Sequence, residues 1–334
     1  MQRSKLTKAI LLLSLFGGNA VVAEGQPDFY GQFNLGLLDA KNAAGERLWQ
    51  VENQASRLGV KGEQELDNAL KLIYQYEVGV NPADNAKPIL SQRNAFIGVK
   101  GAYGQIIMGN FDTPLKLAQA KVDLFNDTAL DMTAFLAGEV RHNQSVQYST
   151  PKLFEALTAH VDWMPKEKKA QKEGLSASLE YQSSLLTLAL AVDNQVAGDG
   201  GVVTGKADPL NSVRAVLTVK PLSSLQLGLL AQNSQGIDQD KSEETNWLAS
   251  AQWTIDKLAL KAQFGQGLAD KTKTGAKTDA GISQAVLGVD YILGKNTTTY
   301  VYSGITRYED GAGGTVAGKS REESTTGFGL KYKF

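Results

Sequence analysis

The sequence predicts an all-β protein, a sixteen-stranded antiparallel β-barrel that spans a membrane. Three observations predict this fold. Apolar and polar side chains alternate with a period of two along almost every segment, which is typical of strands with two different faces. The connections between these segments are alternately long and short. The chain of 334 residues also ends on a strand whose last residue is aromatic.

The alternation divides the chain into sixteen segments, and an even number is usual for a single-chain bacterial barrel. In the first segment, Phe29, Phe33 and Leu35 share one face, while Gln32 and Asn34 share the other. Many segments are longer than the roughly 5–6 residues usual in soluble sheets, which suits tilted membrane strands. In chain order the predicted strands are residues 28–39, 52–63, 68–80, 92–100, 104–111, 141–149, 155–164, 174–183, 184–194, 211–220, 224–233, 245–255, 257–267, 282–293, 297–308 and 323–334.

The terminal strand carries apolar side chains at every second position up to Phe334. An exposed strand edge attracts other strands, so soluble proteins seldom end in this way. In a transmembrane barrel the last strand pairs with the first, and no edge remains. The alternative is an edge strand of a soluble sandwich. The residues on the apolar face are Phe328, Leu330, Tyr332 and Phe334.

The connections favour an outer-membrane barrel over a soluble sandwich. Outer-membrane barrels have short periplasmic turns and longer outer loops. A soluble sandwich gives no reason for strict alternation. The long connections cover residues 41–50, 81–91, 112–140, 165–173, 195–210, 234–244, 268–281 and 309–322.

The N-terminus predicts export. Residues 1–8 contain three cations and no acid, residues 9–16 are apolar, and small residues follow up to Ala23. This pattern is typical of a secretory signal peptide, and the apolar run is too short to span a membrane as a helix. We therefore expect a signal peptide over residues 1–23 and one barrel domain over residues 24–334. A permanent N-terminal anchor is the alternative.

Composition narrows the classes of function. Without the three cations of the signal peptide, the net charge changes from −1 to −4, and no basic block remains. This argues against a nucleic-acid partner. The chain has no cysteine and two histidines, so we expect no disulfide, no metal site, no cofactor and no catalytic residues.

The connection over residues 112–140 is too apolar for a free surface loop, and long loops are usually functional. Its side chains include Leu115, Phe125 and Phe135, which need a surface to pack on. Asp123, Asp127 and Asp131 recur every fourth residue, which predicts a helix with these acids on one face.

Several short motifs occur in an order that resembles the general trimeric porins of Gram-negative outer membranes. They are Phe29-Tyr30-Gly31-Gln32, residues 56–62, residues 109–114, the long third loop and the closing phenylalanine. The resemblance covers residues 28–334. It implies a homotrimer of water-filled barrels, each with the third long loop folded inward, that lets ions and small hydrophilic solutes diffuse. It also implies contact with outer-membrane lipid and lipopolysaccharide, and Phe334 as an assembly signal for the barrel-assembly machinery.

The resemblance further implies a pore constriction in which a basic wall faces an acidic loop. The wall would contain Arg57, Arg93 and Arg141, and the loop Asp123, Asp127 and Asp131. Other lumen-wall positions would be Gln32, Lys61 and Glu77. The alternation independently groups Arg57 with Lys61 and Arg141 with Ser145 and Gln147, whereas the face of Arg93 also holds Ala95 and Ile97.

The charge of −4, the loop acids and Gln32, where some porins have a wall lysine, favour a weak preference for cations. Three other functions compete with a diffusion channel. A substrate-specific channel is the nearest, and a non-channel adhesin is more distant. A hydrolase would need more than His142 and His160, because no serine lies in a nucleophile-like turn.

Overall fold

The computed structural model describes residues 26–42, 44–84, 88–166, 173–198, 200–202, 209–237, 239–312 and 318–334. The predicted signal peptide, residues 1–23, lies outside these ranges. The strands are β1 (Asp28–Lys41), β2 (Arg47–Asn53), β3 (Arg57–Glu65), β4 (Lys71–Val80), β5 (Leu90–Gly101), β6 (Gly104–Asp112), β7 (Arg141–Ser149), β8 (Leu157–Met164), β9 (Gly174–Gln182), β10 (Leu186–Ala197), β11 (Pro209–Leu222), β12 (Leu225–Gly236), β13 (Glu243–Ile255), β14 (Leu258–Lys271), β15 (Gly281–Gly294), β16 (Thr297–Glu309) and β17 (Ser320–Lys333). Between them lie the short helix α2 (Pro114–Leu117) and the 3₁₀ turns η1 (Asp67–Ala69) and η2 (Met132–Ala134).

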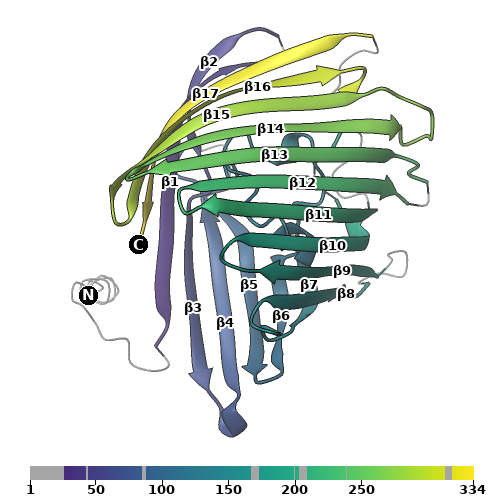
Figure 1. The fold of residues 1–334 in the computed structure, drawn as a ribbon. Coiled ribbons are helices and arrows are strands. Elements are labelled where there is room, and N and C mark those ends of the chain that lie inside the picture. The colour runs from purple at the N-terminus through teal and green to yellow at the C-terminus, as the bar shows by residue number, and fades with distance from the viewer. Residues whose placement is uncertain are drawn as a thin grey trace, which may run out of the picture.

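These strands form one closed antiparallel sheet (Figure 1). From β3 onward each strand pairs with the next, and β17 pairs with β1 over Gln32↔Lys333 to Lys41↔Ser324. β2 and β3 both pair with β1, so together they occupy the place of one membrane-spanning strand. Such a position in the barrel, whether filled by one strand or by two, is called a stave below. The seventeen strands therefore make sixteen staves, and the predicted fold class is confirmed.

A short interruption separates β2 from β3. Ala55 adopts a left-handed backbone conformation with φ 58°. On either side of it, the Nε2 of Gln54 donates to the hydroxyl of Tyr302 at 2.7 Å, and the Oγ of Ser56 accepts from the backbone N–H of Asn34 at 2.9 Å. The expected long connection over residues 41–50 is wrong in extent, because β1 continues to Lys41 and β2 begins at Arg47, which pairs with Lys41.

The chain closes around its last residue. The backbone N–H of Gly31 donates to the carbonyl of Phe334 at 2.9 Å, and the N–H of Phe334 donates back to Gly31 at 3.1 Å. The ring of Phe334 stacks on Phe33 of β1 and on Tyr332, with centroid separations of 6.1 and 5.9 Å. The terminal residue thus extends the hydrogen-bonded seam between β1 and β17.

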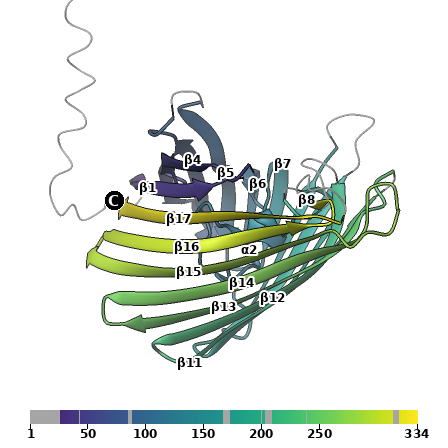
Figure 2. The same cartoon turned by 90° about the horizontal axis from the view of Figure 1, so that it is seen from above.

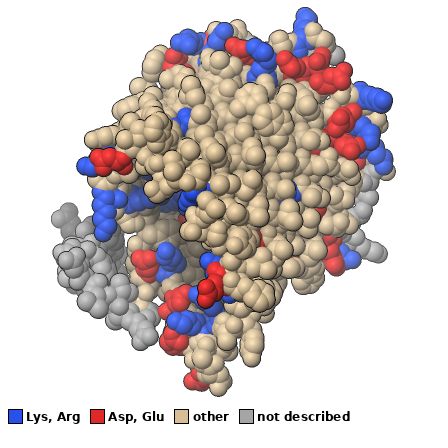
Figure 3. Space-filling model, in the orientation of Figure 1, with Lys and Arg blue, Asp and Glu red and all other residues tan. Residues whose placement is uncertain are grey.

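The outer face of the barrel is apolar. In mid-strand positions, Leu190 of β10 is 61% exposed and Leu229 of β12 is 54% exposed, while their inward-facing neighbours are buried. Figure 3 shows a broad uncharged surface with Lys, Arg, Asp and Glu mainly along its margins and in a hollow. No helix in the described ranges is long and apolar enough to cross a membrane.

Residues 113–140, called loop 3 below, connect β6 to β7 and pack against the inner side of β9–β16. In Figure 2, α2 lies between the wall of β11–β17 and the opposite wall of β4–β8. A Cβ on Gly265 of β14 would stand 2.1 Å from the ring of Phe135, so only glycine leaves room for this ring. The buried apolar side chains of loop 3 in this cluster are Leu115, Ala118, Val122, Met132, Phe135 and Leu136. Those of the wall include Ala189, Ala191, Val216, Leu230, Leu248 and Ile282.

The middle of loop 3 packs across the seam between β1 and β17, against residues on both sides of it. Phe125 and Leu130 form a second buried cluster with Leu38 of β1 and with Tyr300 and Tyr302 of β16. The predicted helix through the three loop acids is wrong, because α2 ends at Leu117 and only Met132–Ala134 has a 3₁₀ turn later in the loop. Buried apolar contacts, rather than local helical hydrogen bonds, fix the path of the loop.

Candidate functional site

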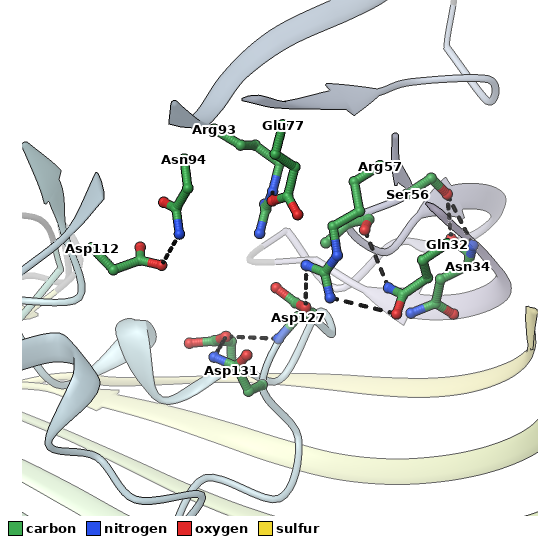
Figure 4. A network of polar contacts seen from close by, with 12 residues as sticks. Gln32, Asn34, Ser56, Arg57, Glu77, Arg93, Asn94, Asp112, Asp127 and Asp131 are labelled. Carbon is green, nitrogen blue, oxygen red and sulfur yellow. Dashed lines mark hydrogen bonds and ion pairs between the residues drawn. The ribbon is translucent and has the colours of Figure 1, made fainter. Parts of the chain in front are cut away.

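Charged side chains from the wall and from loop 3 meet inside the barrel. In Figure 4, Arg57 and Arg93 extend from the wall toward Asp127 and Asp131 of loop 3. Arg57 begins β3, Arg93 lies near the start of β5, and Arg141 begins β7. All three arginines line one cavity of about 630 Å³ between this wall and the loop.

Arg57 is the wall residue that reaches the loop. Its Nη1 lies 3.3 Å from Oδ2 of Asp127, and Nη2 donates to Oε1 of Gln32 at 3.4 Å. The amide of Gln32 donates in turn to the carbonyl of Ala55 at 3.2 Å, which holds the glutamine beside Arg57. The side chains of Arg57 and Asp127 are 23% and 32% exposed, so this ion pair stays open to water.

Arg93 points inward because of a β-bulge. Tyr76 pairs with Ala95 and Val78 with Gln92, so Arg93 and Asn94 both lie opposite Glu77. Two residues facing one reverse the alternation of the strand, which removes the sequence-based conflict with Ala95. The Nε of Arg93 donates to Oε1 of Glu77 at 2.5 Å, and the hydroxyl of Tyr30 donates to Oε2 at 2.9 Å. Glu77 therefore acts within the wall as the buried partner of Arg93.

Arg141 pairs with an acid that the sequence interpretation did not select. Its Nη2 lies 2.9 Å from Oδ1 of Asp112, the last residue of β6. Lys116 of α2 contacts the same oxygen at 3.0 Å, and Asn94 donates to Oδ2 at 3.1 Å. Asp112 lies in the motif over residues 109–114, but nothing in its spacing predicted that it would lie between two cations.

Asp123 supports loop 3 from inside. Its Oδ1 accepts from the N–H of Phe125 and from the amide of Gln263, both at 2.9 Å, and Oδ2 accepts from the N–H of Met132 at 3.1 Å. Burial, together with the negative charge of Asp131, raises the pKa of Asp123 to about 7. This side chain is buried against the wall and does not face Arg57.

Asp131 caps the turn η2. Its Oδ1 accepts from the N–H of Thr133 at 2.9 Å, and Oδ2 accepts from the N–H of Asp127 at 3.0 Å. Burial raises the pKa of this carboxyl too. Of the three predicted loop acids, therefore, only Asp127 makes an ion pair with the arginine wall in the described part of the chain.

Lys61 lies away from this group. It is 3.6 Å from Asp28, and both side chains are more than half exposed. Its ammonium also lies 5.3 Å from the centre of the Tyr30 ring. Lys61 is not among the residues that line the cavity.

The cavity includes further charged residues that the sequence interpretation missed. The acids that line it are Asp112, Asp123, Asp127, Asp131, Glu139 and Glu180, and the cations are Arg57, Arg93, Arg141, Lys116, Lys121 and Lys220. Lys121 and Lys220 are exposed and have no ion pair among the described residues. No group of three or more metal-ligating side chains occurs in the described ranges. The arrangement can orient water and charged solutes without any chemical step.

Comparisons with known proteins identify the family and the fold of this chain. The family model of the Gram-negative porins matches residues 9–313. The chain is 24% identical to the major outer membrane protein P.IB of Neisseria gonorrhoeae, over 90% of this chain and 93% of that protein. It is also 24% identical to the P.IB protein of Neisseria lactamica, over 98% of this chain and all of that protein.

Solved structures show the same fold. An anion-selective porin from Comamonas acidovorans matches with a TM-score of 0.76 at 19% identity, over 93% of this chain and all of that one. The trimer form of OmpT, an outer membrane protein of Vibrio cholerae, matches with a TM-score of 0.68 at 17% identity, over 93% of this chain and all of that one.

The closed barrel with a charged interior defines a passive membrane channel. The chain belongs to the Gram-negative porin family. It is therefore a porin of the outer membrane, which lets ions and small hydrophilic solutes pass, and it is not an enzyme.

Proposed function

We propose that the cavity between loop 3 and the arginine wall is the constriction of the pore. The observation that carries this proposal is the ion pair between Arg57 and Asp127, because it brings a charge of the loop against a charge of the wall at the edge of the cavity and stays accessible to water. Arg93 and Arg141 extend the basic side, and each is held by an acid of the wall. Asp123 and Asp131 support the shape of the loop in this proposal, and Asp127 is its charged surface.

A field between opposed charges orders the water in a narrow neck. A nonpolar solute must displace this ordered water, whereas a small polar solute or ion can replace its contacts. Gln32 takes part by holding the guanidinium of Arg57 in place. Lys61 would act outside the neck, where it could attract anions from the bulk.

The charges in the cavity favour a weak preference for anions, opposite to the expectation from net charge. The lining contains equal numbers of acids and cations, but Glu139 and Asp123 are buried. Lys121 and Lys220 remain exposed and are free of described ion pairs. The Comamonas acidovorans neighbour, described as anion-selective, agrees with this direction.

The test is single-channel recording in a planar bilayer with a salt gradient. Arg57→Ser combined with Arg141→Ser should change the conductance and shift the reversal potential toward cation preference, because two accessible positive charges leave the neck. Arg307→Ser is the matched control, since Arg307 pairs with Glu322 on an exposed part of β16 and β17. An unchanged reversal potential in the double variant would refute the basic wall. A well-folded wild-type protein that forms no open pores would favour a gated, substrate-specific channel.

We propose further that three copies assemble, and that residues 1–23 act as the signal peptide. The apolar outer face of the strands and the trimer form of the Vibrio cholerae neighbour support the assembly. The outward-facing aromatic residues near Phe334 support recognition by the barrel-assembly machinery and contact with lipid and lipopolysaccharide. Mass measurement of the detergent-solubilised protein should give three copies, and a mass of one copy would refute the trimer.

A further inference from the structure

One arginine inside the barrel is not accessible to any solute. Arg214 of β11 has no exposed surface, and it is the largest fully buried side chain in the described residues. A buried guanidinium loses its hydration, so it is stable only where its donors find acceptors and its charge finds a partner.

The partners of Arg214 come from the wall and from loop 3. Its Nε donates to Oε1 of Gln232 on β12 at 2.7 Å. Nη1 donates to the carbonyl of Leu115 at 3.0 Å and to Oε1 of Glu139 at 2.5 Å. Nη2 donates to the carbonyl of Ala137 at 3.3 Å. One guanidinium therefore binds three points of loop 3.

These three points lie at the two ends of the loop. Leu115 is in α2, directly after β6, whereas Ala137 and Glu139 come directly before β7. Arg214 thus joins the beginning and the end of loop 3 to the wall opposite the arginines of the proposed constriction.

Additional contacts restrict the movement of this junction, which consists of Arg214 with Leu115, Ala137 and Glu139. Oε2 of Glu139 accepts from the amide of Gln119 at 3.0 Å, and the amide of Gln232 donates to the carbonyl of Ala137 at 2.8 Å. Gly138 has φ 91°, which favours glycine, and a Cβ there would stand 2.7 Å from Cδ2 of Leu115. The two ends of the loop therefore pack directly against each other at Arg214.

The junction also connects to charges that line the cavity. Glu139 lines it, and α2 carries Lys116, which contacts Asp112 at 3.0 Å. Asp112 holds Arg141 at 2.9 Å. A loss of the Arg214 contacts would release α2, and with it the lysine that helps to hold Asp112 against Arg141.

We propose that Arg214, through Glu139, is a positioning residue that fixes the width of the pore. It acts from behind loop 3 and touches no solute. The inference rests on the proposed constriction, because it assigns the residue that holds the loop side of that constriction against the wall.

The experiment records single channels of Arg214→Met, which keeps most of the volume but removes the charge and all donors. We expect a mean conductance higher by about twofold, with larger current fluctuations, because loop 3 no longer has one fixed position. Arg214→Lys keeps the charge with a single nitrogen, so it should restore only part of the wild-type behaviour. Arg307→Met, which removes an exposed ion pair, is the control and should conduct like the wild type.

Folding is checked for every variant by heat-modifiable migration in a gel. If Arg214→Met does not fold, Glu139→Gln decides, because it removes the partner charge at nearly constant volume and must give the same increase in fluctuations. Wild-type conductance and noise in a folded variant would overturn the role of Arg214. If Arg57→Ser with Arg141→Ser still alters selectivity in that case, the constriction stands. If that double variant also has the selectivity of the wild type, the proposed constriction itself is wrong.

Discussion

Asp123 shows how a single carboxyl group can hold a loop in place inside a channel. Three N–H donors surround its oxygens, yet its burial against β14 and its proximity to Asp131 raise its pKa to about 7. The folded protein therefore binds a proton at pH values where an unfolded chain, with an ordinary pKa of 3.8, has already lost it.

This difference predicts a pH dependence of stability. A raised pKa favours the neutral form in the folded state, so the stabilisation is full below the ordinary pKa and is lost as the pH rises toward about 7. We expect the unfolding midpoint of the barrel in detergent to fall between about pH 4 and pH 7 by more in the wild type than in Asp123→Asn. Phe154→Ala, which changes an exposed turn and no ionisable group, is the control and should keep the wild-type slope. Equal slopes in Asp123→Asn and the wild type would show that Asp123 does not titrate there.

The sequence predicted the residue types of the site better than their pairings. Arg57 and Asp127, which the resemblance assigned to opposite sides of the constriction, lie 3.3 Å apart. The spacing of four residues between the acids led to a wrong prediction. It suggested a helix, whereas the path of the loop follows buried apolar contacts. The roles of Asp112 and Arg214 were not predicted, because the fold determines their partners. Leu115 and Glu139, which bind Arg214, are 99 and 75 residues away from it in the sequence.

Strands were the most predictable elements, because a period of two directly reports which face meets lipid. All sixteen staves were expected, with ends within a few residues in most cases. The exceptions are backbone irregularities. The bulge opposite Glu77 inverts the face of Arg93, and the interruption at Ala55 divides one stave into β2 and β3. A single residue inserted into a pairing leaves no trace in composition, so sequence alternation cannot locate it.

The closing strand supplies a prediction for an element. Phe334→Ala removes one ring, and with it two stacked pairs, from the seam but leaves its backbone hydrogen bonds. Each aromatic pair contributes about 0.5–1.5 kcal/mol, so we expect a loss of roughly 1–3 kcal/mol in the free energy of unfolding. Phe154→Ala is the matched control, because Phe154 is 91% exposed in the turn between β7 and β8. Reversible unfolding in detergent measures both, and equal stability of the two variants would contradict a stabilising role of the last ring.

At the scale of the whole molecule, the two faces of a strand meet different environments. The apolar outer face meets lipid, whereas the inner face meets water or loop 3. Leu190 faces outward from the middle part of β10, and its neighbour Ala189 faces loop 3. The barrel therefore has an apolar exterior and a polar interior, the reverse of a soluble protein. It also has an apolar core within the lumen, where loop 3 packs on the wall.

The outer face yields a prediction for the membrane. Leu190→Arg places a charge in the hydrocarbon region, so the free energy of unfolding from a bilayer should fall by roughly 2–4 kcal/mol. Phe154→Arg, in an exposed turn, should cost much less. Refolding into lipid vesicles with denaturant titration distinguishes them. A cost of the same size at both positions would mean that the middle of β10 does not face lipid.

The contacts of loop 3 on both sides of the seam also bear on the order of assembly. Its middle packs on Leu38 of β1 and Tyr302 of β16, and Asp127 reaches Arg57 beside β1. This apolar surface is complete only when the first and last staves have paired. Phe125 and Leu130 therefore lack part of their packing surface in a barrel that is not yet closed. We therefore expect the channel to narrow only after β1 and β17 have paired, so that formation of the Arg57–Asp127 contact would report a closed barrel.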